Sequence, residues 1–345
     1  MRIWMRRFLA ALLVMALLCP GSAAFATEVD KTEPESATVP AEPEETQMPE
    51  TEPEETEPEK EIQTYTVDTE SEIYRVCAET AEGMAYDQLL VYDATNDEIF
   101  FADTREGPKL YPASTTKLFS TYVALQHLKP DEVITAGKEL NLVQPGSSVA
   151  YIGKGHSLYV RTLVEAMMLP SGNDAAIVLA TAAGRRIAED ESLEPEEAIA
   201  VFVQEMNRMA EELGFERSHF SNPDGWHTGS HYTCLNDMAR IARLALGDKT
   251  ISKYMRKGKD EVVFVSGQSI TWENTNLFLN EEKGFYRGDA IGMKTGFTRQ
   301  AEYCLMSAFK CGGRQLVIGV FGYEDEYQRF RDVNMLIREC KAVLN

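Results

Sequence analysis

The chain has 345 residues, 26% of them charged, and a formal net charge of −21. This length permits one large domain or two small ones, and the acidic balance argues against a nucleic-acid-binding surface. Much of the acidity lies in residues 27–70, which hold 16 acidic and 2 basic side chains among prolines and threonines. Such a segment cannot bury enough apolar surface to fold. We therefore predict a disordered acidic linker over residues 27–70.

The first residues are typical of a secretory signal peptide. Arg2, Arg6 and Arg7 precede an apolar run over residues 8–18, and Ala24-Phe25-Ala26 offers a cleavage site. The apolar run is short for a bilayer span. We therefore predict a signal peptide over residues 1–26 and a protein that is secreted, in the cell wall or at the outer face of the cytoplasmic membrane. An uncleaved signal that anchors the chain to the membrane is the alternative.

Residues 71–345 are predicted to form one compact unit, with helices in the middle and strands towards both ends. Gly312-Gly313 predicts a tight turn that pairs the last two strands antiparallel. The predicted elements, in chain order, are a helix over 71–84, a hairpin of strands 88–93 and 98–102, a helix from Pro112 onwards, helices over 158–169, 174–187, 194–213 and 235–246, strands over 261–265, 269–272, 291–295, 303–309 and 315–321, and a closing helix over 327–343.

Five cysteines follow the predicted signal peptide: Cys77, Cys234, Cys304, Cys311 and Cys340. An odd number does not form a disulfide framework. We expect buried small hydrophobic residues, with one pair conceivable and no connectivity defined by the sequence.

The first chemical motif is Ser114 with Lys117. On a helix, positions i and i+3 share a face, so the hydroxyl and the amine can meet. A serine at a helix N-terminus lies where a developing anion is favoured, and it needs a base to become a nucleophile. Lysine can be that base if burial or a neighbouring cation lowers its pKa.

Two later segments make a catalytic role for Ser114 and Lys117 more specific. Ser171-Gly172-Asn173 follows 57 residues after Ser114, and Lys294-Thr295-Gly296 follows 123 residues after Ser171. Each segment alone also fits a structural role, such as a helix-capping turn or a strand end. The three in this order are typical of penicillin-binding proteins and class A β-lactamases.

Residues 85–340 resemble the serine-type D-alanyl-D-alanine carboxypeptidases, the low-molecular-mass penicillin-binding proteins of peptidase family S11. The resemblance implies an α/β (α+β) fold of the serine β-lactamase/DD-peptidase type, in which a helical domain packs against a five-stranded antiparallel sheet flanked by helices. It is carried by Pro-Ala-Ser-Thr-Thr-Lys at 112–117, Leu-Pro-Ser-Gly-Asn-Asp-Ala at 169–175, Phe-Ser-Asn-Pro-Asp-Gly at 220–225, His-Tyr at 231–232, Asn-Thr-Asn at 274–276 and Gly-Met-Lys-Thr-Gly-Phe-Thr at 292–298.

The resemblance further implies removal of the terminal D-alanine from peptidoglycan stem peptides through an acyl-enzyme on Ser114, with β-lactams as covalent inhibitors and no cofactor. Lys117 would be the general base, Ser171 a proton relay and Asn173 a positioning group. Lys294 would add positive charge to the cleft.

The remaining expected site residues bind the substrate. Thr295, Gly296 and Arg329 would meet the substrate's terminal residue and its carboxylate, and the backbone N–H groups of Ser114 and Phe297 would hold the oxyanion. Arg331 is the competing choice for the carboxylate-binding arginine.

Two positions depart from the family's usual pattern. Glu302 stands where a glycine usually follows the Lys-Thr-Gly strand, which could change the backbone or place a negative charge near the cleft. Asp224 stands where a histidine is usual, which we interpret as a structural change.

Three other functions compete with this interpretation. A class A-like β-lactamase would need a deacylating glutamate before a Leu-Asn pair, but Tyr232 stands before Leu235-Asn236. A cell-wall binding module without turnover is the second alternative, and endopeptidase activity on cross-links stays open. His227 and His231 have the i, i+4 spacing of zinc ligands, yet no glutamate follows His227 and no third ligand is suggested, so we expect no metal site.

Overall fold

The structure is a computed structural model, and it describes residues 65–345. The predicted signal peptide and nearly all of the predicted linker lie outside the described residues. None of the helices among residues 65–345 is long and apolar enough to cross a membrane.

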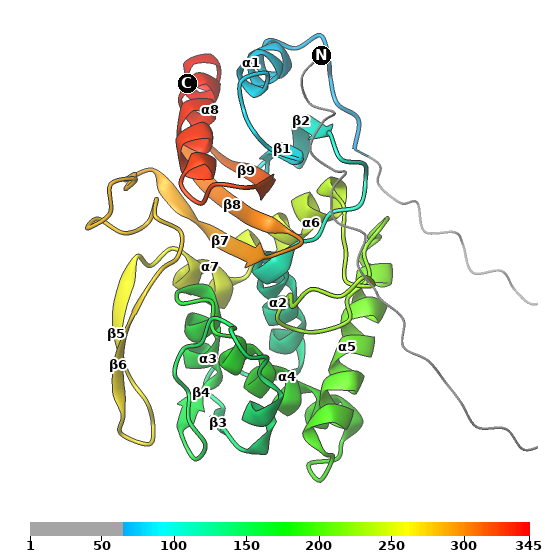
Figure 1. Cartoon of the computed structure of the whole chain (residues 1–345), viewed down its shortest axis with the longest axis vertical. Helices are drawn as coiled ribbons and strands as arrows, with labels where there is room; N and C mark the ends of the chain where they lie inside the picture. Colours follow the sequence, from blue (N-terminus) through cyan, green and yellow to red (C-terminus); the bar gives the residue numbers. More distant parts are fainter. Residues whose placement is uncertain (1–64) are drawn as a thin grey trace, which may run out of the picture. The chain divides into compact units, whose positions relative to one another are not determined.

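A five-stranded antiparallel sheet joins the two ends of the described chain (Figure 1). Its strand order is β2-β1-β9-β8-β7. The strands are β1 (Gln88–Asp93), β2 (Glu98–Thr104), β7 (Ala290–Thr298), β8 (Glu302–Cys311) and β9 (Arg314–Tyr323). The predicted hairpin and the predicted Gly312-Gly313 turn are confirmed, because β1 pairs with β2 and β8 pairs with β9.

Two helices cover one face of this sheet. They are α1 (Glu72–Ala81) and α8 (Gln328–Leu344), the first and last helices of the described chain (Figure 1). Alternate strand residues face them, so Leu89 and Val91 of β1 share an apolar cluster with Leu336 and Ile337 of α8. This layer fixes α8, whose first turn carries Arg329.

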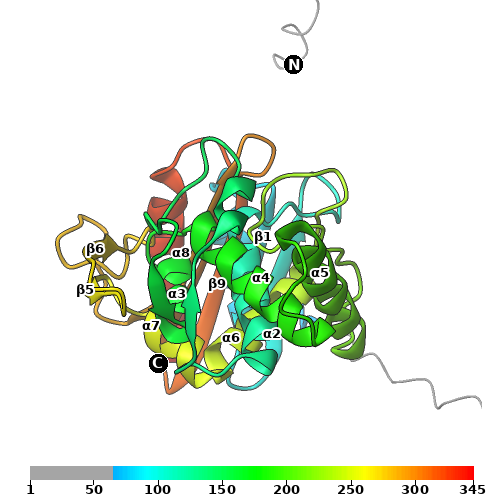
Figure 2. The same ribbon diagram turned by 90° about the horizontal axis from the view of Figure 1, so that it is seen from below.

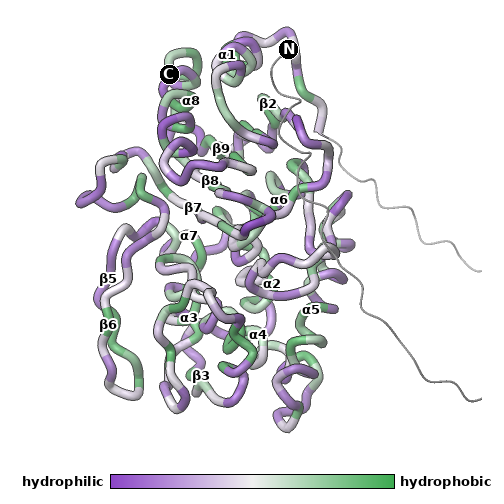
Figure 3. Tube along the Cα trace, in the orientation of Figure 1, coloured by the Kyte–Doolittle hydropathy of each residue, from purple (hydrophilic) through white to green (hydrophobic). Residues whose placement is uncertain are grey.

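Six helices form the layer on the other face: α2 (Lys117–His127), α3 (Val160–Met168), α4 (Asn173–Ala188), α5 (Pro195–Glu212), α6 (Leu235–Gly247) and α7 (Lys249–Met255). α4 lies among its neighbours α2, α3 and α5 (Figure 2), and apolar residues run along it (Figure 3). Gly184 lets α5 approach closely, since a Cβ there would lie 1.8 Å from the Ala198 carbonyl oxygen. Helix α4 is therefore packed tightly among its neighbours, and it supports the Ser171–Asn173 loop at its N-terminus.

The secondary structure departs from the sequence prediction in several places. The helix predicted over 158–169 is wrong at its start, because Leu158 and Tyr159 belong to β4 (Ser157–Tyr159), which pairs with β3 (Val133–Thr135). Helix α7, strand β3 and a 3₁₀ turn over Lys138–Leu142 were not predicted. Strands β5 (Lys259–Val263) and β6 (Ser269–Glu273) form a separate hairpin outside the main sheet.

Candidate active site

Ser114 lies in a tight turn that leads into α2. A 3₁₀ turn over Ala113–Thr116 places Ser114 one turn before the helix, and Ala113 has a positive φ of 46°. Two glycines allow other segments to press against this turn. A Cβ on Gly225 would lie 1.9 Å from the Ala113 carbonyl oxygen, and one on Gly296 would lie 3.0 Å from the Ser114 nitrogen. The nucleophile turn is thus held between the 221–225 loop and β7.

Lys117 connects three parts of the site through its amine. Its Nζ lies 2.9 Å from Ser114 Oγ, 2.7 Å from Asn173 Oδ1 and 2.6 Å from the Asp224 carbonyl oxygen. The side chain has no exposed surface. Burial lowers the pKa of Lys117 to about 8, and the nearby charges of Asp224 and Asp174 oppose that shift. About one-tenth of this amine is therefore neutral at pH 7, and the neutral form can accept the Ser114 proton.

The Ser171–Asn173 loop reaches the same place from the N-terminus of α4. Ser171 has a positive φ of 63° and is 4% exposed. The Asp174 carboxylate accepts hydrogen bonds from the backbone N–H groups of Ala150 and Ile152, which fastens the loop to the neighbouring segment. Asn173 Nδ2 donates to Ser147 Oγ at 3.0 Å while its Oδ1 faces Lys117. The amide of Asn173 is thereby held in one orientation.

The Lys294-Thr295-Gly296 segment lies on β7, the edge strand beside the nucleophile turn. Thr295 Oγ1 lies 2.5 Å from Thr275 Oγ1. Lys294 has no exposed surface, and its Nζ donates to the Thr295 carbonyl oxygen at 3.1 Å. Burial lowers the pKa of Lys294 well below its usual value, and the charges of Lys117 and Arg329 add to that effect. Burial, rather than Lys294, is the main cause of the lowered pKa of Lys117.

These segments border one cleft of about 450 Å³. Its lining includes seven of the nine predicted site residues: Ser114, Ser171, Asn173, Thr295, Gly296, Phe297 and Arg329. The two predicted lysines, Lys117 and Lys294, lie fully buried behind this lining. A substrate in the cleft would therefore meet the hydroxyl of Ser114 directly and the two amines through their neighbours.

Arg329 reaches the cleft from the first turn of α8. Its Nη1 donates to the carbonyl oxygens of Gly296 at 3.3 Å and Cys304 at 2.6 Å, and its guanidinium lies 5.0 Å from the Tyr303 ring centroid. Burial lowers the pKa of Arg329 to about 10, so the group stays charged at neutral pH. Arg331 is half exposed, pairs with Asp325 and does not line the cleft.

Several contributors were not identified from the sequence. His231 is buried, with its Nε2 2.8 Å from Thr116 Oγ1 and its Nδ1 accepting the Ser221 N–H at 3.2 Å. Because a backbone N–H can only donate, Nδ1 is the acceptor and Nε2 carries the proton. His231 thus ties the nucleophile turn to the loop that supplies the Asp224 carbonyl.

The sequence contains one indication of this role of His231. The His231-Tyr232 pair is among the motifs that the chain shares with the family, but the motif alone does not say what His231 does. Trp226 and Ser147 also line the cleft; neither belongs to a motif that distinguishes it from a loop residue. Among residues 65–345, no group of three or more His, Cys, Asp or Glu side chains is arranged to hold a metal ion.

The two departures from the family pattern have distinct structural results. Glu302 keeps a left-handed backbone with a φ of 53°, which favours glycine. Its side chain lines a separate hollow that also includes Asp87 and Glu324, away from the cleft lining. The Asp224 side chain accepts the Trp226 N–H at 3.2 Å, while its backbone oxygen serves Lys117.

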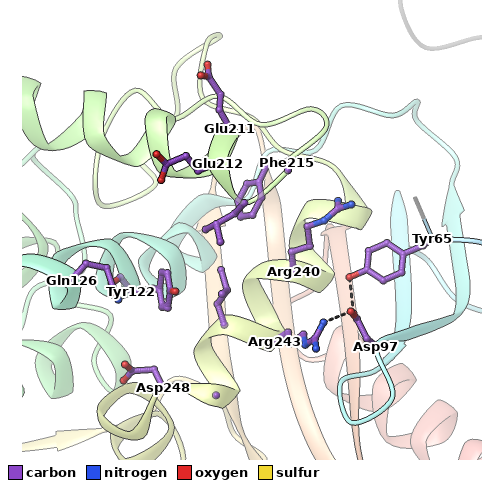
Figure 4. Close-up of a pocket in the computed structure, with 14 residues that line it drawn as sticks. Tyr65, Asp97, Tyr122, Gln126, Glu211, Glu212, Phe215, Arg240, Arg243 and Asp248 are labelled. Atoms are coloured by element: carbon purple, nitrogen blue, oxygen red, sulfur yellow. Dashed lines mark hydrogen bonds and ion pairs between the residues drawn. The ribbon is translucent and has the colours of Figure 1, made fainter. Parts of the chain in front are cut away.

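A larger hollow of about 960 Å³ lies between α2, the end of α5 and α6. Figure 4 shows Tyr65 and Arg243 both directed at Asp97, to which the first donates at 2.8 Å and the second forms an ion pair. None of the predicted site residues lines it. Although this hollow is larger than the cleft, it holds none of the residues expected to carry out the chemistry.

Comparison with known proteins identifies the family. The sequence profile described as D-alanyl-D-alanine carboxypeptidase matches residues 76–325. The D-alanyl-D-alanine carboxypeptidase DacF of Bacillus subtilis is 28% identical over 232 residues, which are 66% of this chain and 55% of DacF. The D-alanyl-D-alanine carboxypeptidase of Streptomyces sp. K15 is 32% identical over 225 residues, 63% of this chain and 72% of that protein. The match thus spans little more than half of DacF.

Solved structures agree with this result. The Streptomyces K15 DD-transpeptidase superposes with a TM-score of 0.66 at 26% identity, covering 75% of this chain and 98% of that one. The D-alanyl-D-alanine carboxypeptidase DacD of Francisella tularensis gives 0.61 at 25% identity, covering 74% and 70%. The expected fold, with its helical region against a five-stranded antiparallel sheet, is confirmed. The profile match over residues 76–325, together with the fold and the motifs, shows that the chain belongs to the D-alanyl-D-alanine carboxypeptidase family.

Proposed function

We propose that this protein is a serine-type D-Ala-D-Ala carboxypeptidase that removes the terminal D-alanine from peptidoglycan stem pentapeptides. The observation that carries the proposal is the position of Lys117 Nζ, 2.9 Å from Ser114 Oγ and buried beside the cleft. A hydroxyl beside a desolvated amine is an activated nucleophile.

Acylation begins when Ser114 Oγ attacks the carbonyl carbon between the two D-alanines and neutral Lys117 accepts its proton. The backbone N–H groups of Ser114 and Phe297 stabilise the negative charge that develops on the carbonyl oxygen. Ser171 relays a proton to the nitrogen of the leaving D-alanine. Asn173 holds the substrate's amide and the amine of Lys117. Water then hydrolyses the ester, and Ser114 is restored.

The terminal carboxylate of the substrate gives the enzyme its preference for a chain end. Thr295 donates its hydroxyl to this carboxylate, and Arg329 supplies a charge that remains at neutral pH. Gly296 lets the substrate lie close to β7. Lys294 lies behind the strand, where burial and the charges of Lys117 and Arg329 hold its pKa well below the usual value, so the lasting charge near the carboxylate comes from Arg329. β-Lactams carry a comparable carboxylate and acylate Ser114 as covalent inhibitors.

The site implies a place outside the cytoplasm, since stem peptides are exposed there. Residues 1–26 then direct export, residues 27–70 form the linker and residues 71–345 form the catalytic domain. An uncleaved signal peptide would hold the enzyme at the outer face of the membrane.

Measurement of D-alanine release from a pentapeptide ending in D-Ala-D-Ala tests the proposal. Wild type should release one D-alanine per peptide, and Ser114→Ala should abolish release. Ser120→Ala is the matched control, because Ser120 is a buried serine on α2 whose hydroxyl has no hydrogen-bond partner among residues 65–345. This control should keep full activity. Peptide binding without release by wild type would favour a binding module, and rapid hydrolysis of penicillin would favour a β-lactamase.

A further inference from the structure

Two buried thiols meet where the first and last helices pack together. Cys77 lies on α1 and Cys340 lies on α8, and their sulfur atoms are 3.7 Å apart. Both side chains have no exposed surface. Both are free thiols in the structure. Of the other three cysteines, Cys304 and Cys311 lie on β8 and Cys234 lies just before α6; Cys304 directs its thiol towards the backbone carbonyl of Tyr111 at 3.7 Å.

We propose that Cys77 and Cys340 form a disulfide bond that ties α1 to α8 in the mature, exported protein. The proposal rests on the export argued above, because disulfides persist in oxidising compartments. A disulfide needs a sulfur–sulfur distance of about 2.05 Å, so the two atoms must approach by roughly 1.6 Å. Rotation of the two short side chains, with any small shift of the helices that it requires, would have to supply this approach.

The oxidant is a disulfide-bearing thiol oxidoreductase or a small-molecule disulfide. The thiolate of one cysteine attacks the oxidant, forms a mixed disulfide and expels one thiolate. The second cysteine, after losing its proton, attacks the sulfur of the first and expels the other thiolate. Two protons and two electrons thus leave the protein, and the oxidant becomes two thiols. Contact with Cys77 and burial both raise the pKa of the Cys340 thiol in the folded chain, so the thiolate needed for exchange forms more readily while α1 and α8 are apart.

The bond would link residues 263 positions apart, close to the two ends of the described chain. Closing so long a loop restricts the unfolded chain strongly. Helix α8 also carries Arg329 near its N-terminus, while Cys340 lies near its C-terminal end. The disulfide would therefore anchor the far end of the helix that brings the arginine to the cleft, without touching the cleft itself.

Peptide mapping of the full chain, refolded in a glutathione redox buffer and alkylated without reduction, tests the proposal. Trypsin should release residues 76–105 joined to residues 339–341, with a mass two hydrogens below the sum of the free peptides. Reduction should separate them and lower the melting temperature by ~5–10 °C. Cys77→Ser and Cys340→Ser should each remove the joined peptide and the sensitivity of the melting temperature to reductant.

Cys311→Ser is the matched control. Cys311 lies near enough to Cys340 for the two thiols to interact electrostatically, so Cys311 is the neighbour that could compete for Cys340. The joined peptide should persist in this variant. Full alkylation of Cys77 and Cys340 after refolding, or a bond from Cys340 to Cys311 instead, would overturn the proposal. The mapping needs no turnover, so its result is independent of whether D-alanine is released.

Discussion

The rate of Ser114 acylation should follow the deprotonation of Lys117. Only the neutral amine can accept the serine proton, and burial lowers the pKa of Lys117 to about 8. At pH 7 about one-tenth of the enzyme then has a neutral lysine, and at pH 9 about nine-tenths does. The acylation rate should therefore rise about tenfold per pH unit below pH 7 and level off above pH 9. An unburied lysine would keep the rate rising to about pH 10.

The assay is the second-order rate of labelling by a fluorescent penicillin at low drug concentration, measured from pH 5.5 to 10. The Asp224→Asn variant is a second test, because it should shift the pKa of Lys117 in a known direction. The Asp224 charge raises the pKa of Lys117 against the effect of burial, so its removal should move the midpoint to lower pH. Glu302→Gln is the control, because Glu302 lies outside the cleft lining, and its midpoint should stay unchanged. A rate that does not depend on pH, or an upward shift in Asp224→Asn, would refute the role of Lys117 as the base.

Three further changes test other parts of the account. Glu302→Gly should raise the free energy of unfolding by about 1 kcal/mol, because it relieves a left-handed non-glycine backbone; a lower melting temperature in calorimetry would contradict this. Gly225→Ala should lower the penicillin acylation rate at least ~100-fold, since its Cβ would lie 1.9 Å from the Ala113 carbonyl oxygen next to the nucleophile. An unchanged rate would contradict this, because it would show that the turn around Ser114 can move aside without loss of activity. His231→Ala should reduce kcat for D-alanine release about tenfold or more with a smaller change in KM, since it frees the turn at Thr116; a raised KM with an unchanged kcat in a folded variant would place His231 in substrate binding instead.

The sheet and most helices followed from local patterns. Apolar runs bounded by turn residues predicted all five strands of the main sheet, and the Gly312-Gly313 turn fixed one pairing. The family resemblance, rather than periodicity, predicted that strands from both ends share a sheet. Leu158 and Tyr159 were assigned to a helix because their pairing partners, residues 133–135, are distant in sequence. Helix α7 has only seven residues and offers too little periodicity to detect.

In the candidate site, too, local sequence motifs predicted some residues, and others depend on contacts between distant segments. Side-chain motifs identified Ser114, Lys117 and Asn173, and the structure places Lys117 within hydrogen-bonding distance of both Ser114 and Asn173. The Asp224 carbonyl could not be found in this way, because every residue has a backbone oxygen and only the fold selects this one. His231 was visible as part of a motif, but its two partners come from separate segments that only the folded chain joins.

The sequence shows that Glu302 replaces the glycine usual in the family, but it does not show how the replacement changes the backbone or where the carboxylate lies. The backbone keeps the left-handed conformation of a glycine position, and the carboxylate points to a hollow shared with other acidic residues. Burial raises the pKa of Glu302, with the charges of Asp87 and Glu324 adding to it. Glu302 itself does not line the cleft.

The most direct test of the central claim is the mass of the protein after brief exposure to benzylpenicillin, followed by peptide mapping of the adduct. One drug molecule should add to each chain, on the peptide that contains Ser114, and none should add to Ser114→Ala. An adduct on another residue, or labelling that survives in Ser114→Ala, would contradict it.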